Sequence, residues 1–121
     1  MAKYVDGFVI NVPRKKVAAY RKMAQLGARV WMEHGALEYR ECVGEELNVA
    51  FGRPFPKMTQ CKAGETVIFA WIVYRNKKHR DAVNKKVMSD PRLQSPPADM
   101  PFNPANMSFG GFEVLVEKVK K

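Results

Sequence analysis

The pattern of apolar and polar positions at the start of the chain predicts a strand followed by a helix. Residues 3–12 are rich in β-branched and aromatic side chains and end at Pro13, which indicates a strand. Pro13 suits the first turn of a helix, where its missing N–H costs no hydrogen bond. We expect that helix over 14–34, ended by Gly35 in a left-handed conformation. Its apolar stripe has helical spacing and consists of Val17, Tyr20, Ala24, Gly27 and Trp31.

The middle of the chain predicts two strands separated by a long loop. Residues 36–43 alternate between two faces, one of them much more polar, which is typical of a strand. Residues 44–64 are punctuated by glycine and proline and predict a loop. Residues 66–74 are apolar on both faces, so this strand should be central and covered on both sides.

The remaining pattern predicts a second helix and a last strand. Asn76 is a suitable N-cap for a helix over 77–89, which Pro91 should stop. Residues 91–111 hold five of the eight prolines and end in two glycines, so we expect a loop there. Residues 112–119 should form the last strand.

The order β-α-β-β-α-β predicts an α+β, ferredoxin-like fold. A four-stranded antiparallel sheet would carry two helices on one face, in a single domain over 1–121. The strands at 3–12, 66–74 and 112–119 are nevertheless apolar on both faces. A bare apolar face of that size would promote aggregation. We therefore expect a homodimer in which a second copy covers the second face of the sheet.

The formal net charge of +9, from 21 Lys and Arg against 12 Asp and Glu, raises nucleic acid as a partner. The basic residues lie on the two predicted helices and at the end of the chain. They are not interleaved with aromatic residues, as a platform for single-stranded nucleic acid requires. This distribution favours a basic, solvated surface over a nucleic-acid partner.

The two cysteines and the apolar runs bear on location. Cys42 and Cys61 have no CxxC spacing and no clustered histidine, so we expect neither a metal site nor a disulfide. Two free thiols fit a reducing compartment. Asp6 interrupts the N-terminal apolar run, which argues against a secretory leader, and the run at 67–74 is too short to span a bilayer. We expect a cytoplasmic protein without a membrane partner.

Five stretches carry a resemblance to a known family. They are YVDGF (4–8), WMEHGALEYRECVGE (31–45), GETVIFAWIVY (64–74), HRDAVNKKVMSDPR (79–92) and MPFNPANMSFGGFEV (100–114). Together they resemble the YbaA-like bacterial family of unknown function, which is similar to the dimeric α/β-barrel superfamily. The resemblance implies the same fold and a dimer. Because that superfamily includes monooxygenases, dehydratases and ligand-binding regulators, it implies neither a reaction nor a cofactor.

Four residues are candidates for a pocket between the helices and the sheet: Asp6, His34, Trp71 and His79. Both histidines lie at helix ends, and both helices should cover the same sheet face, so we expect one polar mouth on an apolar layer. Each residue also has a structural interpretation. His34 can cap its helix, His79 can be a hydrogen-bonded core residue, Asp6 can pair with an Arg or Lys, and Trp71 can be a core aromatic.

Three classes of function stay open at this point. The first is an enzyme or binding protein that acts on a small molecule in that cleft. The second is an RNA-associated basic protein, and the third is a structural or stress-related dimer without catalysis. The sequence identifies no substrate, and the cofactor is unknown.

Overall fold

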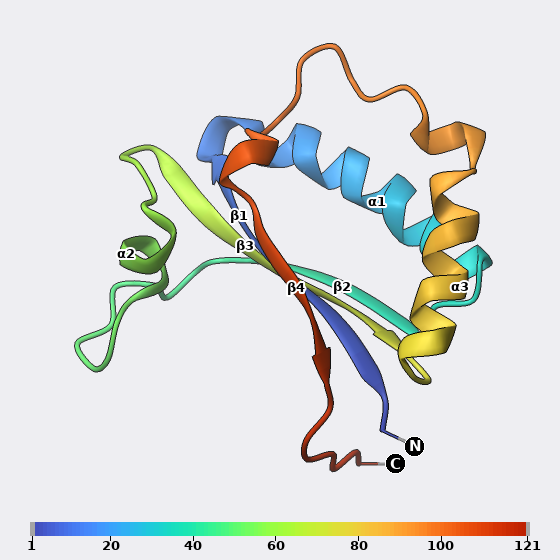
Figure 1. Ribbon diagram of the computed structural model, residues 1–121. Helices are drawn as coiled ribbons and strands as arrows, with labels where there is room; N and C mark the ends of the chain where they lie inside the picture. The colour runs from blue at the N-terminus through green and yellow to red at the C-terminus, as the bar shows by residue number, and fades with distance from the viewer. Residues whose placement is uncertain (1, 121) are drawn as a thin grey trace.

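The computed structural model describes residues 2–120, which form one sheet with helices on it (Figure 1). Three short 3-10 helices lie at Arg14–Lys16, Pro91–Leu93 and Pro104–Asn106. The main elements in chain order are β1 (Tyr4–Pro13), α1 (Val17–Glu33), β2 (Glu38–Val43), α2 (Phe55–Thr59), β3 (Glu65–Tyr74), α3 (Lys77–Met88) and β4 (Ser108–Glu113).

The sheet has the order β2-β3-β1-β4, and every neighbouring pair is antiparallel. Helices α1 and α3 cover one face (Figure 1), which confirms the predicted ferredoxin-like fold. The loop over 44–64 contains α2, which lies against one end of the other face. There the Asn11 side-chain amide donates to the Thr59 carbonyl at 2.8 Å, and the rings of Phe55 and Phe69 are 6.0 Å apart.

Helix α1 ends at Gly35 as predicted, because this glycine has a φ of +115°. The Ala36 N–H donates to the Trp31 carbonyl at 3.0 Å, and the Gly35 N–H donates to the Met32 carbonyl at 3.2 Å. These two bonds form a Schellman motif, which satisfies the last carbonyls of the helix. The chain then reverses into β2, which pairs with β3.

Helix α3 begins at the predicted cap and is fixed to the sheet by an ion pair. The Asn76 side chain accepts a hydrogen bond from the His79 N–H at 2.8 Å. One turn into the helix, Arg80 Nη1 donates to Asp6 Oδ1 at 2.7 Å. The same guanidinium lies 4.8 Å from the ring centroid of Tyr4. Because Asp6 is buried on β1, this contact joins α3 to the centre of the sheet.

The apolar core fills the space between the sheet and the helices in two adjoining clusters. One cluster lies under α3, and the other lies under the first half of α1. The first consists of Val30, Ala36, Ile72, Tyr74, Val83 and Val87. The second consists of Ile10, Val12, Tyr20, Ile68 and Ala70.

Strand β4 differs from the sequence prediction, which put it at 112–119. It begins four residues earlier, at Ser108, and ends at Glu113. It includes Gly110 and Gly111, whose residue type indicated a loop. A Cβ atom on Gly111 would collide with the Tyr4 ring on β1, so a glycine is needed for β4 to pair closely with β1. Residues 114–120 continue beyond the sheet.

Candidate functional site

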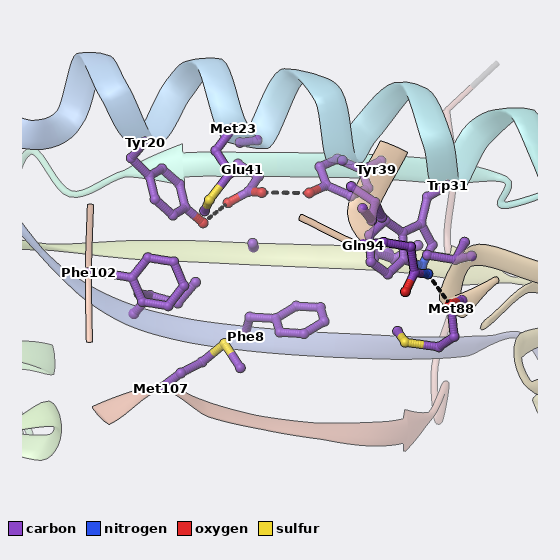
Figure 2. Close-up of a pocket in the computed structure, with 17 residues that line it drawn as sticks. Phe8, Tyr20, Met23, Trp31, Tyr39, Glu41, Met88, Gln94, Phe102 and Met107 are labelled. Carbon is purple, nitrogen blue, oxygen red and sulfur yellow. Dashed lines mark hydrogen bonds between the residues drawn. The ribbon is translucent and has the colours of Figure 1, made fainter. Parts of the chain in front are cut away.

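A cavity of about 440 Å³ lies between the sheet, α1 and the connection from α3 to β4 (Figure 2). Apolar side chains from β1, β3, both long helices and that connection form most of its wall. Its rings and thioethers belong to Phe8, Tyr20, Trp31, Tyr39, Phe102, Met23, Met88 and Met107. A largely apolar cavity of this size with few polar groups is typical of a small-molecule site.

The polar centre of the cavity is the carboxylate of Glu41, which accepts hydrogen bonds from two tyrosines (Figure 2). Tyr20, on α1, donates to Oε1, and Tyr39 donates to Oε2 at 2.6 Å. Tyr39 and Glu41 are two residues apart on β2, so their side chains share the inward face. Gly27 on α1 gives Tyr39 room, because a Cβ there would lie only 3.1 Å from the phenol oxygen.

Both phenols of this Tyr20–Glu41–Tyr39 triad remain protonated. Burial, reinforced by the hydrogen bond to Glu41 and its negative charge, raises the pKa of Tyr20 well above its usual value. Burial and the same carboxylate also raise the pKa of Tyr39. Each phenol therefore keeps its single O–H, and that O–H is directed at Glu41.

Other hydrogen-bond donors at the cavity are already engaged. The indole N–H of Trp31 donates to the Asn84 side-chain oxygen at 3.1 Å. The Gln94 amide donates to the Met88 carbonyl at 2.6 Å and to the Asp90 carbonyl at 3.3 Å. The polar atoms left to meet a ligand are therefore mainly acceptors.

The triad also borders a second groove, on the outer side between α1 and β2. This groove has a volume of about 440 Å³ and includes Arg21 and Gln25 along α1. Tyr20, Tyr39 and Glu41 line both spaces. Arg21 makes no ion pair with Glu41 in the part of the chain that the structure describes.

Asp6 and Trp71, two of the residues predicted for the pocket, lie outside the wall of the inner cavity. Asp6 is held by Arg80 under α3. Trp71 lies on the face of β3 that points away from α1 and α3, where its indole N–H donates to Glu38 at 2.7 Å. The ion pair with Arg80 is the structural role that the sequence analysis considered for Asp6. Trp71 lies neither in the wall of the cavity nor in the core between the sheet and the helices.

The structure brings the two histidines to the same end of the sheet, but neither lines the inner cavity. His34 Nε2 lies 2.8 Å from Asp90 Oδ2. His79 Nδ1 accepts from the Arg75 N–H at 3.0 Å. Its Nε2 is 3.5 Å from where a Cβ on Gly35 would be. Both rings thus contact groups at the helix ends, while the cavity takes its polar atoms from the triad.

The triad was not predicted from the sequence, although one signal for it was present. Within 36–43, the alternation puts Tyr39 and Glu41 on the same strand face as Leu37 and Val43. A carboxylate on the less polar face of a strand needs a partner if that face is buried. That need for a partner is the feature that could have drawn attention to Glu41.

Comparison with known proteins gives the family. A model of the family described as "Protein of unknown function (DUF1428)" matches residues 3–104. The chain belongs to this DUF1428 family. Its relatives include the uncharacterized protein YbaA of Escherichia coli strain K12, 41% identical over 116 residues that cover 96% of this chain and 99% of the relative. YbaA of Shigella flexneri matches with the same identity and coverage.

A solved structure supports the fold. The crystal structure of a dimeric ferredoxin-like protein from an uncultured marine organism matches with a TM-score of 0.57. The match covers 98% of this chain and 100% of the other, at 11% sequence identity. At that identity the likeness supports the ferredoxin-like fold of this DUF1428 chain and nothing about its ligand.

Two properties of the described residues concern metals and membranes. Over residues 2–120, no three side chains of His, Cys, Asp or Glu gather as they would around a metal ion. In the same part of the chain, none of the helices combines the length and the apolar character needed to cross a bilayer.

Proposed function

We propose that this protein binds a small, largely apolar molecule in the cavity between the sheet and α1. The observation that carries the proposal is the Tyr20–Glu41–Tyr39 triad, whose partly buried carboxylate lies in an otherwise apolar wall. A carboxylate at such a place costs desolvation energy and contributes nothing to apolar packing. Recognition of a ligand by Glu41 would account for its position there.

The proposal can be tested by a thermal-shift screen with small aromatic and aliphatic compounds and metabolites. A ligand at a hundred times its dissociation constant should stabilise the fold by ~2.7 kcal/mol. The Ala24→Phe variant should abolish the shift, because Ala24 lines the cavity and a benzyl group there would fill part of it. The control is Ala19→Phe, at an exposed position of the same helix. If no compound stabilises the wild type, or if both variants respond equally, the proposal is wrong.

We also propose that the protein is a homodimer through the second face of the sheet. Two observations support it. On that face Phe69 is 45% exposed and Phe112 is 62% exposed. Beyond β4, Leu115 and Val116 are 95% and 79% exposed. The apolar surface thus continues from the sheet into the C-terminal segment. A second copy about a two-fold axis would cover both.

The oligomeric state can be measured by light scattering at micromolar concentration. The wild type should have the mass of a dimer, and Phe112→Glu should have the mass of a monomer because it buries a charge in the interface. The matched control is Phe109→Glu on the same strand. Phe109 stacks on Phe8 at 5.9 Å, which places it on the opposite face, so this change should leave the dimer intact. A monomeric wild type would refute the proposal.

We also propose that the protein is cytoplasmic. The thiols of Cys42 and Cys61 are both free, which fits a reducing compartment. Cell fractionation followed by immunoblotting tests this, and recovery in a periplasmic or membrane fraction would contradict it.

A further inference from the structure

The inner cavity has the opposite charge to the protein as a whole. The chain has a formal net charge of +9. Among the described residues that line the cavity, however, Glu41 is the one formally charged side chain at neutral pH. Basic residues are therefore abundant on the molecule, yet none contributes to the wall of this cavity.

The hydrogen bonds within the triad leave that negative charge unneutralised. Two phenols donate to Glu41, which stabilises the carboxylate without adding a positive charge. Both phenols stay neutral because burial raises their pKa values. Arg21 lines only the outer groove. A partly buried carboxylate in such surroundings is stabilised most by a cation that forms an ion pair with it and also donates hydrogen bonds to it.

The rest of the wall suits the same kind of ligand. The remaining lone pairs of Tyr20, Tyr39 and Glu41 accept hydrogen bonds, as does the side-chain oxygen of Gln94. An alkylammonium group has up to three N–H donors and no acceptor. The Trp31 ring lies 6.1 Å from the Tyr39 ring, centroid to centroid, and adds aromatic surface for the apolar part of such a ligand.

We propose that the cavity is selective for an organic cation, an ammonium group attached to an apolar body. The ammonium group pairs with Glu41 between Tyr20 and Tyr39. The apolar body lies toward Phe8, Phe102 and the methionine side chains, whose flexible thioethers adapt to its shape. This inference rests on the proposed function and names the chemical class of its ligand.

Three probes that share a naphthalene ring test the inference: 2-naphthylmethylamine, 2-naphthylmethanol and 2-naphthoate. Calorimetry at pH 7 and about 0.15 M salt suits the comparison, because charges more than ~8 Å apart are then largely screened. The amine is protonated at that pH. It should bind the wild type at least tenfold more tightly than the alcohol, or ~1.4 kcal/mol, and the carboxylate should bind most weakly.

A matched pair of variants assigns the selectivity to the carboxylate. Glu41→Gln should weaken amine binding at least tenfold and change alcohol binding less than threefold. Glu46→Gln removes the same charge at an exposed position outside the cavity and should change neither. If Glu41→Gln fails to fold, the wild-type ranking of the three probes still decides, since it needs no variant.

The outcomes separate this inference from the proposed function. If the alcohol or the carboxylate binds the wild type as tightly as the amine does, the cavity binds apolar molecules but does not select cations. Full amine affinity in the Glu41→Gln variant would likewise overturn the selectivity. If none of the three probes binds and the thermal-shift screen is also negative, both proposals are overturned.

Discussion

Replacing Arg80 with methionine should destabilise the protein by leaving a buried carboxylate without its partner. Asp6 is 6% exposed, and Arg80 Nη1 lies 2.7 Å from its carboxylate. Breaking a buried ion pair from one side costs roughly 3–5 kcal/mol. The Arg80 side chain is 19% exposed, so we expect the low end of that range, about 3 kcal/mol. Methionine retains much of the apolar stem, so the loss is mainly electrostatic.

The change Asp6→Asn should cost less, about 1–2 kcal/mol. Asparagine retains an oxygen that can accept from Arg80. The guanidinium would also keep its 2.8 Å pairing with Asp81 and its partial contact with water. The double variant should cost less than the sum of the two single changes, with a coupling free energy of about 1–2 kcal/mol.

Urea unfolding followed by circular dichroism measures these free energies by linear extrapolation. All variants need the same protein concentration, because the proposed dimer would make apparent stability depend on concentration. Lys78→Met, an exposed position on α3, is the control and should stay within about 0.5 kcal/mol of the wild type. The reasoning fails if Arg80→Met costs less than about 1 kcal/mol, or if the two changes are additive.

Three further predictions concern other sites. The Arg92 guanidinium holds the pKa of Asp90 below its usual range. The resulting stabilisation is present above the unfolded pKa of about 3.9 and is lost as the pH falls below it. Asp90→Asn should therefore flatten the loss of stability between about pH 5 and pH 2, and an unchanged slope in acid unfolding would contradict this. Gly111→Ala should cost about 1–3 kcal/mol in urea unfolding through overpacking against Tyr4, and a neutral result would show that β4 can move away. His79→Ala should change the affinity of a cavity ligand by less than about threefold, or ~0.7 kcal/mol, measured by calorimetry.

Much of the fold could be predicted because apolar periodicity and local capping signals agree along most of the chain. Asn76 and Gly35 mark helix ends through bonds within a few residues, so their role is visible in the sequence. The glycines of β4 are the exception. Their residue type indicates a loop, but Gly111 lies in the strand where a Cβ would collide with the Tyr4 ring on the neighbouring strand. A requirement set by a distant residue has no local signature.

The candidate site was harder to predict for a related reason. Histidines at helix ends indicated a polar mouth, and the structure engages them in contacts with Asp90 and Arg75 instead. Tyr20 was correctly assigned to the apolar stripe of its helix. Its bond to Glu41 depends on how α1 lies across β2, which the packing of the whole domain decides. Alternation along β2 grouped the side chains but did not show which group faced the helices.

In this cavity, the groups that determine the charge of the ligand and the groups that determine its size and shape come from different parts of the chain. The charged and hydrogen-bonding atoms of the triad come from α1 and β2, which are regular elements fixed by the core. Leu93, Gln94 and Phe102 come from the connection between α3 and β4, and connections of this kind tolerate substitution and changes of length. Selection could therefore alter the size and shape of the accepted molecule through that connection while the triad continues to set its charge. Such an arrangement allows ligand preference to diverge in small steps without loss of the fold.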